Sequence, residues 1–166
     1  MYFVTMYCMI HTLKTATDQK QIVLKKISEV IAEHHSQSLL DIGAGQRFLA
    51  TALSQKVPRY VAVESDPQRT AVLRAKNIPV IEGVFPHTHI QGVYDLVLAS
   101  HSSPESAELY EPFFTKAWNL VATGGLLLTI TFKGVQDDLF ALARRFDKNW
   151  GDDDLLKLHE IHRVLS

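Results

Sequence analysis

The sequence is poor in cysteine and has no excess of either charge. Cys8 is the one cysteine among 166 residues, which excludes a disulfide framework within the chain and a cysteine-rich zinc site. The 17 Lys and Arg residues against 18 Asp and Glu residues give a formal net charge of −1. Binding to a phosphate backbone normally requires a surplus of positive charge. The composition therefore argues against nucleic acid as a partner, and the low cysteine content is typical of a reducing, cytoplasmic compartment.

Long hydrophobic runs are also absent, since none approaches the roughly 20 apolar residues that a membrane-spanning helix needs. We therefore expect a soluble protein without a membrane partner. Residues 1–13 are apolar but lack the basic start and the small-residue cleavage site of a secretory signal. They predict a docked N-terminal strand or helix, or a frayed tail. No repeat, low-complexity tract or charge block divides the 166 residues, which suit one domain.

The sequence does contain short apolar runs that alternate with stretches of helical periodicity. This pattern is typical of strands that are buried on both faces and joined by helices. The apolar runs predict five strands, at 38–42, 60–64, 79–82, 94–99 and 125–132. Helices are predicted before the first strand and at 47–56, 66–76, 107–121, 139–146 and 152–165. Right-handed crossovers then give an α/β fold with a mainly parallel sheet between two helical layers.

Local signals refine three of these helices. Asp66 followed by Pro67 predicts an N-cap and a first helical turn. In the helix at 107–121 the apolar stripe begins at Leu109, and the glycines at 124–125 are expected to mark the turn into the last strand. The buried stripe of the first helix is predicted from near-helical spacing to consist of Ile22, Ile27, Val30 and Ile31.

A glycine-rich turn follows the first predicted strand. Gly43 and Gly45 would let the chain bend sharply and bring backbone N–H groups close to a ligand at a helix N-terminus. Glu64 ends the second strand, 19 residues after Gly45 (64 − 45), at the spacing where an acid reaches ribose hydroxyls. The pair predicts a nucleotide-like ligand. The alternative is a tight strand-to-helix turn that binds nothing.

The stretches LLDIGAG, VAVESD, YDLVLAS and GGLLLTIT, in this order, resemble the motifs of class I S-adenosylmethionine-dependent methyltransferases over about residues 20–133. The resemblance implies a three-layer αβα sandwich with strand order 3-2-1-4-5, without the usual strands 6 and 7. It also implies a single methyltransferase-like domain over 1–166. That domain would comprise an N-terminal segment and helix (1–36), a cofactor-binding core (37–133) and C-terminal helices (134–166).

The same resemblance implies S-adenosylmethionine as the cofactor. The first motif, which surrounds the methionine part in that family, matches 41–45, and Glu64 matches the acid that holds both ribose hydroxyls. The cofactor-binding residues implied in this way are Asp41, Gly43, Ala44, Gly45, Glu64, Ser65, Asp66, Gly83, Val84, Phe85 and Ser100.

Methyl transfer from a sulfonium needs few catalytic side chains, because the methyl group is already activated and the protein mainly positions the acceptor. His101 follows the fourth strand and is the predicted general base, with a loop histidine as the alternative. Base-methylating members often carry Asn/Asp/Ser-Pro-Pro-Tyr/Phe after that strand, whereas this chain has Ser102-Ser103-Pro104-Glu105. A small-molecule acceptor is therefore favoured over a nucleic acid, although LLDIGAG with VAVESD also resembles ribosomal RNA dimethyltransferases.

Three departures from the family pattern support an alternative, a non-catalytic domain that binds a cofactor or a partner. Arg47 stands where the family has a third glycine, and Val84 where it commonly has an aspartate. Without strands 6 and 7, the last strand would be an open edge unless the terminal helix, the N-terminal segment or a second copy in a homo-oligomer covers it. A nicotinamide-dependent oxidoreductase is disfavoured because Phe48 replaces the third glycine of its motif.

The histidine pairs do not predict a metal site. His87 with His89, and His159 with His162, each lack a third ligand at a characteristic spacing, which zinc requires.

Overall fold

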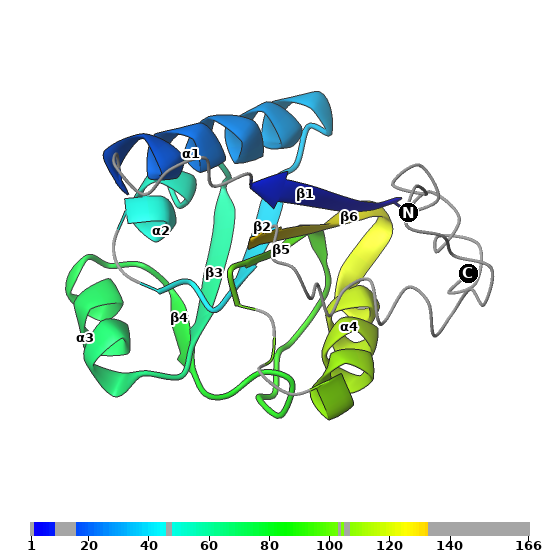
Figure 1. Ribbon diagram of the computed structural model, residues 1–166. Helices are drawn as coiled ribbons and strands as arrows, with labels where there is room; N and C mark the ends of the chain where they lie inside the picture. The colour runs from blue at the N-terminus through cyan, green and yellow to red at the C-terminus, as the bar shows by residue number, and fades with distance from the viewer. Residues whose placement is uncertain (1, 9–15, 46–47, 103, 105–106, 133–166) are drawn as a thin grey trace.

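A parallel sheet lies between helices in the computed structural model, which describes residues 2–8, 16–45, 48–102, 104 and 107–132 (Figure 1). The elements in chain order are β1 (Tyr2–Cys8), α1 (Ala16–Glu33), β2 (Ser38–Ile42), α2 (Phe48–Leu53), β3 (Arg59–Glu64), α3 (Pro67–Ala75), β4 (Val80–Glu82), β5 (Tyr94–Ser100), the 3-10 helix η1 (Ala107–Leu109), α4 (Tyr110–Asn119) and β6 (Val121–Phe132). The helices predicted at 139–146 and 152–165 fall outside the described residues.

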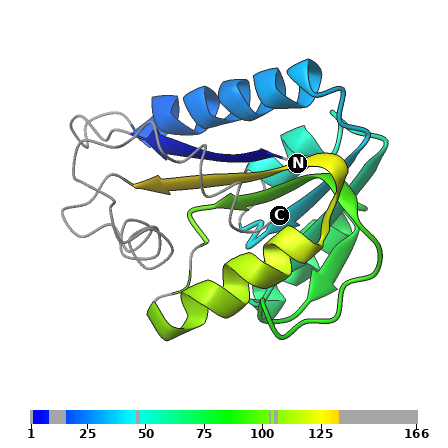
Figure 2. The same ribbon diagram turned by 90° about the vertical axis from the view of Figure 1, so that its right-hand side faces the viewer.

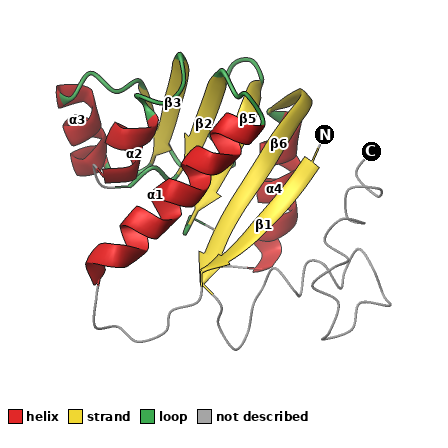
Figure 3. Ribbon diagram, turned by 90° about the horizontal axis from the view of Figure 1, so that it is seen from above, coloured by secondary structure: helices red, strands yellow, loops and turns green. Residues whose placement is uncertain are grey.

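The strand order is β1-β6-β5-β2-β3-β4, and every pair in this sheet is parallel. The five predicted strands correspond to β2 through β6, so the predicted order 3-2-1-4-5 is confirmed. The N-terminal segment adds a sixth strand, β1, beside β6, in a register that pairs Tyr2 with Leu126 (Figure 3). The edge of β6 is therefore covered by the chain's own first strand and needs no second copy to cover it.

Two apolar clusters fill the space on either side of the sheet. Figure 2 shows α1 on one side of the sheet and α4 on the other. On one face, α1, α2 and α3 cover alternate residues of the strands, among them Leu39 and Leu98. On the other face, α4 covers the intervening residues, among them Leu40 and Val97. The side chains of a β-strand alternate between faces, so the continuous apolar runs seen in the sequence are explained by burial on both sides.

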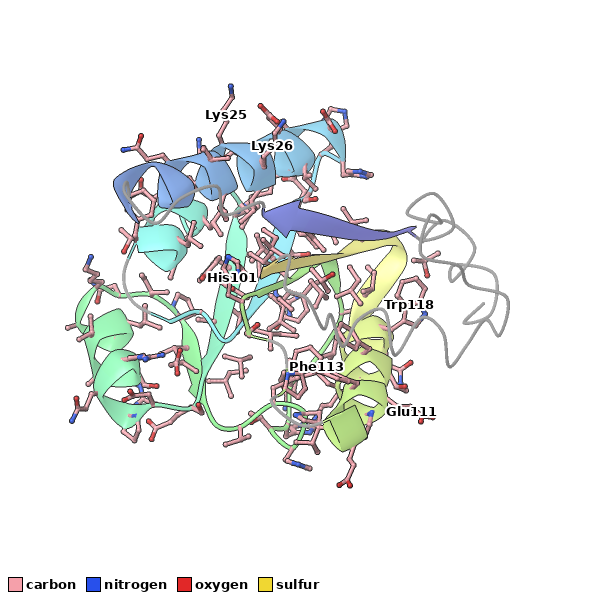
Figure 4. The ribbon with its side chains drawn as sticks, in the orientation of Figure 1. Lys25, Lys26, His101, Glu111, Phe113 and Trp118 are labelled. Atoms are coloured by element: carbon pink, nitrogen blue, oxygen red, sulfur yellow. The ribbon has the colours of Figure 1, made fainter. Side chains whose placement is uncertain are left out.

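The buried stripe of α1 differs from the prediction at one position. Val23, Ile27 and Ile31 are buried, whereas Ile22 is 57% exposed. Residues spaced four apart lie on one helix face, and Val23 rather than Ile22 continues that series. Two lysines of this helix, Lys25 and Lys26, point away from the sheet (Figure 4).

The predicted helix at 107–121 begins as η1 and continues as α4, which ends before β6 starts at Val121. The prediction that the turn into the last strand lies at the two glycines was therefore wrong. They lie inside β6, where a Cβ on Gly125 would come within 2.8 Å of the Asp95 carbonyl oxygen. Glycine is required there because β6 approaches β5 closely. Leu109, expected in the buried stripe, is 39% exposed because it precedes α4.

The amino ends of β2 and β5 are joined by one carboxylate. Asp95 Oδ2 accepts hydrogen bonds from the backbone N–H groups of Gln37 and Ser38 and from the Ser38 hydroxyl, each at 2.9 Å. These bonds fix the register of the two central strands. None of the described helices is long and apolar enough to cross a bilayer.

Candidate functional site

The predicted site residues lie at the carboxyl ends of four neighbouring strands. Residues 41–45 cover the end of β2 and the turn toward α2, and residues 64–66 join β3 to α3. Residues 83–85 follow β4, Ser100 ends β5, and His101 comes directly after it. Because the strands are parallel, these ends share one edge of the sheet. His101 can be seen at the end of β5 (Figure 4).

The glycine turn is held tightly in place. The N–H groups of Gly43 and Ala44 donate to the Val63 carbonyl oxygen at 2.8 and 3.2 Å. Gly43 has φ +69°, a left-handed conformation that favours glycine. A Cβ on Gly43 would lie 2.4 Å from Cβ of Ser102, so the turn also packs closely against the segment after β5.

Glu64 is the residue that ties this turn to the end of β3. Its side chain is buried, and its Oε2 accepts a hydrogen bond from the Gly45 N–H at 2.7 Å while Oε1 accepts one from the Asp66 N–H at 3.0 Å. A carboxylate offers about four acceptor positions, so each oxygen can accept a further donor. The sequence prediction that Glu64 lies beside the glycine turn is met by direct contact.

Asp41 lies beneath the turn on the face covered by α1 and α2. Its Oδ2 accepts a hydrogen bond from the Tyr60 hydroxyl at 2.6 Å, and both side chains are buried. Burial raises the pKa of Asp41 to about 6; the Tyr60 hydrogen bond opposes this rise, and the charge of Glu64 adds to it. Tyr60 was not among the predicted site residues.

Three buried hydroxyls on this edge have no hydrogen-bond partner among the described residues: Thr88, Ser100 and Ser102. Ser102 contacts the Gly43 position, and Thr88 Oγ1 would lie 2.3 Å from a Cβ on Gly83. A buried hydroxyl left unpaired costs roughly 1–3 kcal/mol, which a ligand or water can recover. Two of these hydroxyls, those of Ser102 and Thr88, lie directly against the Gly43 and Gly83 positions.

The segment 83–85 is fixed by α4. Lys116 donates to the carbonyl oxygens of Pro86 and Thr88, and its Nζ lies 5.7 Å from the centroid of the Phe85 ring. Phe85 also packs edge-to-face on Phe113 at 4.8 Å. Val84, by contrast, is 62% exposed. Of these two predicted cofactor residues, Phe85 thus has a packing role toward α4, while Val84 presents an apolar surface at the edge.

Asp66 also has a local structural role. Its Oδ1 accepts the N–H groups of Gln68 and Arg69 at 2.8 and 3.3 Å, which confirms the predicted N-cap of α3. Its neighbour Ser65 is exposed.

His101 adopts a left-handed backbone with φ +53°, and its N–H donates to the Ile130 carbonyl oxygen at 2.8 Å. Desolvation at the end of β5 lowers the pKa of His101. A larger fraction of the imidazole is therefore neutral at pH 7, as a base requires.

Within the part of the chain that the structure describes, no three His, Cys, Asp or Glu side chains are grouped so that they could hold a metal ion. His87 and His89 belong to that part, whereas His159 and His162 do not. Arg47 also lies outside it.

Comparison with solved structures identifies the fold. The chain has the fold of the class I S-adenosylmethionine-dependent methyltransferases, as the sequence motifs predicted. No protein-family model and no curated protein sequence matches the chain.

Among the solved structures, the chain is similar to the N-methyltransferase NodS from Bradyrhizobium japonicum, with 15% identity and a TM-score of 0.61 over 89% of this chain and 84% of that one. It is also similar to an S-adenosylmethionine-dependent methyltransferase from Clostridium acetobutylicum, with 17% identity and a TM-score of 0.62 over 70% and 52% of the two chains. For CalS10, an amino pentose methyltransferase from Micromonospora echinaspora solved with S-adenosylmethionine bound, the identity is 15% and the TM-score 0.59 over 70% and 55%. The matched region is thus about half of each of the last two proteins.

Proposed function

We propose that this chain binds S-adenosylmethionine at the carboxyl edge of β2, β3, β4 and β5 and transfers its methyl group to a small-molecule acceptor. The observation that carries the proposal is the Glu64 carboxylate, which lies against the glycine turn and keeps acceptor capacity on both oxygens. Two adjacent hydroxyls, such as those of a ribose, match two adjacent carboxylate oxygens. When bound, the cofactor supplies an activated methyl group on a sulfonium.

The described residues at this edge supply groups for each part of this cofactor, which supports the proposal. Asp41 and the turn at 43–45 would hold the methionine end, Glu64 the ribose, and Val84 with the segment around it the adenine. The unpaired hydroxyls of Thr88, Ser100 and Ser102 supply polar groups on both sides of that path. We also propose that residues 1–166 act as one domain and that the protein is cytoplasmic, the latter because Cys8 is its one cysteine.

A small molecule is proposed as the acceptor for two reasons. The formal net charge of −1 provides no surplus of positive charge for binding a phosphate backbone, and among the similar structures NodS is an N-methyltransferase and CalS10 an amino pentose methyltransferase. The segment after β5 would orient the acceptor. His101 would accept the proton that a hydroxyl or ammonium acceptor loses.

Replacing Glu64 by Gln tests the cofactor site. We expect affinity for S-adenosylhomocysteine, measured by calorimetry at pH 8, to fall by about tenfold, because one backbone N–H and one ribose hydroxyl lose a charged acceptor. Glu82→Gln is the matched control. Glu82 is the register partner of Glu64 on β4, but it is exposed and paired with Arg74 at 3.0 Å, so its replacement should leave the affinity unchanged.

Three results distinguish the alternatives. Binding of S-adenosylmethionine and S-adenosylhomocysteine but not of NAD supports the proposal. Binding of NAD alone would favour an oxidoreductase. Failure of all three ligands to bind would leave a non-catalytic domain that serves a partner.

His101→Ala separates binding from chemistry. We expect unchanged affinity for S-adenosylhomocysteine and a turnover lowered by about 100-fold, because general-base removal of the acceptor proton is lost. Turnover is measured as S-adenosylhomocysteine released with a panel of amine and hydroxyl acceptors. An unchanged rate on every active acceptor would assign His101 to the loop alone.

A further inference from the structure

Asp41 and Tyr60 form a short, buried side-chain hydrogen bond. The two residues lie on neighbouring strands, where Asp41 pairs in register with Ala62, two residues after Tyr60. The hydroxyl–carboxylate distance is 2.6 Å, and the side chains are 3% and 4% exposed. A bond this short and this well shielded from water is typical of a hydroxyl that donates to an ionised acceptor.

Among the residues that the structure describes, few groups besides Tyr60 could stabilise a negative charge on Asp41. On the same face of the sheet, β5 contributes Leu98, and β3 contributes Ala62 between Tyr60 and Glu64. α1 packs on this face through Val23, Ile27 and Ile31 while Lys25 and Lys26 point outward, and α2 (Phe48–Leu53) contains no charged residue. Among the described residues, the titratable groups that face Asp41 are therefore Tyr60 and Glu64, and Glu64 repels it.

Burial and Glu64 both favour the neutral form of Asp41, and the Tyr60 hydroxyl opposes them. Burial also raises the pKa of Tyr60, followed by the charge and the hydrogen bond of Asp41, so the phenol keeps its proton and remains a donor. A carboxylate that is costly to bury and is held in place by one specific donor is better explained by a ligand than by folding alone.

We propose that Tyr60 is a positioning residue of the cofactor site, which keeps the Asp41 carboxylate charged and fixed beneath the glycine turn to receive the positively charged amino-acid end of the ligand. This inference rests on the proposed function and adds a determinant of ligand class. A ligand that carries an ammonium group near the turn is attracted by Asp41, whereas a nucleoside without that group is not. Tyr60 touches no ligand and acts through Asp41.

The proposal gives the site a defined pH dependence. With the pKa of Asp41 at about 6, the carboxylate is charged above that pH and neutral below it. Affinity for an ammonium-bearing ligand should therefore fall as the pH drops through 6. Removing the Tyr60 hydroxyl takes away a bond to the charged form, so the pKa of Asp41 rises and the fall in affinity begins at higher pH.

The test compares Tyr60→Phe with Tyr94→Phe. Tyr94 is a matched control because it is also a buried tyrosine at the start of a central strand, but its hydroxyl faces the Gln91 carbonyl oxygen at 3.5 Å. The affinity for S-adenosylhomocysteine is measured by calorimetry from pH 5 to 8.5. We expect the midpoint of its decline to move upward by about one pH unit in Tyr60→Phe and not at all in Tyr94→Phe.

Adenosine serves as the second ligand, because it has the ribose and adenine but no amino-acid end. Its affinity should follow the same pH profile in all three proteins. An equal shift for adenosine, or a uniform loss at every pH, would show a structural effect of the substitution and would overturn the positioning role.

A measurement without ligand separates this inference from the proposed function. The Asp41 carboxyl can be titrated by carbon NMR in the wild type and in Tyr60→Phe. An upward shift in the variant supports the control of Asp41 by Tyr60, and an unchanged titration overturns it. If the wild type binds neither S-adenosylhomocysteine nor adenosine at pH 8, the proposed function fails, and the assignment of Tyr60 to a cofactor site fails with it even where the NMR shift is found.

Discussion

Gly43→Ala is expected to lower the free energy of unfolding by about 3 to 4 kcal/mol, because two costs add at this residue. The left-handed φ of +69° disfavours alanine by roughly 1–2 kcal/mol. The new Cβ would also come within 2.4 Å of Cβ of Ser102, and overpacking of this kind costs about 1–3 kcal/mol. Urea unfolding monitored by circular dichroism measures the change.

Two other glycines supply controls for the backbone cost alone. Gly45 has φ +61° and Gly124 has φ +80°, yet a Cβ on Gly45 would meet nothing closer than 3.7 Å and one on Gly124 nothing within 4 Å. Alanine at either position should therefore cost about 1–2 kcal/mol. A loss at Gly43 no greater than at these two would contradict the packing argument.

A double-mutant cycle isolates the contact between Gly43 and Ser102. The clashing atom is Cβ of Ser102, and the next backbone atom, its Cα, lies at 3.7 Å, an ordinary contact distance. Ser102→Gly should consequently recover most of the packing cost of Gly43→Ala, whereas Ser102→Ala keeps that Cβ and should recover none. Additive effects of Gly43→Ala and Ser102→Gly would show that the two segments do not press on each other.

Asp41→Asn is expected to stabilise the fold at pH 8 by about 2 kcal/mol while it weakens cofactor binding by about 100-fold. The pKa of Asp41, about 6 in the folded chain against an ordinary 3.8, makes its ionisation cost roughly 3 kcal/mol at about 1.4 kcal/mol per pKa unit. Asparagine removes the charge and can still accept the Tyr60 hydrogen bond. Part of the gain is lost because its buried NH₂ group needs a partner.

The sign of this effect changes with pH in a defined window. A carboxyl group whose pKa is raised in the folded state favours folding fully below its unfolded pKa, and this contribution is lost as the pH rises through the folded value. The wild type should therefore lose stability from about pH 4 to pH 6 through Asp41, and the variant should lack that loss. Urea unfolding of both proteins at pH 4, 6 and 8 measures it; a variant that is less stable at pH 8 would refute the burial cost.

Such a trade between stability and binding is expected of a functional residue. A charge that evolution could remove with a gain in stability is retained where a ligand requires it. The stability and the cofactor affinity of Asp41→Asn therefore have to be interpreted together. A variant that is more stable but binds the cofactor as tightly as the wild type would leave the buried charge unexplained.

Much of the fold was predictable because local patterns determine it. Strands β2, β3, β5 and β6 follow from apolar runs that are largely buried, whereas the short run of β4 lies at the sheet edge and is half-buried or exposed. The strand order follows from the motifs and the crossover rule. The N-cap of α3 was predictable because Asp66 and Pro67 act within one turn. Glu64 was predictable for the same kind of reason, since its distance in sequence from the turn fixes its place on the neighbouring strand.

Other features depend on which segments meet, which periodicity does not reveal. The apolar residues 1–13 were compatible with a strand, a helix or a tail. Residues 2–8 form the strand β1 because they pair with β6. Ile22 and Val23 are both apolar, so the orientation of α1 on the sheet decides which is buried. The glycines at 124–125 resemble a turn, yet both lie within β6, at a register shift in its pairing with β5 where Gly125 approaches the Asp95 carbonyl oxygen.

The missed site residues were hidden for the same reason. Tyr60 occupies an ordinary strand position, and its importance comes from the register that sets it diagonally opposite Asp41. Ser102 belongs to the polar segment after β5, and the sequence alone does not indicate which side chain of that segment contacts the glycine turn. The packing of that segment against Gly43 distinguishes it.

The pairing of β1 with β6 has a consequence for how the protein is made. The register joins Tyr2 to Leu126, 124 residues apart (126 − 2), so β1 cannot pair with β6 until those residues have been made. Closing so long a loop is entropically costly and gains little until the other strands are assembled. While the 124 residues from Tyr2 to Leu126 are made, the nascent chain must therefore carry an unpaired β-forming segment, and such a segment is exposed to aggregation and to chaperones.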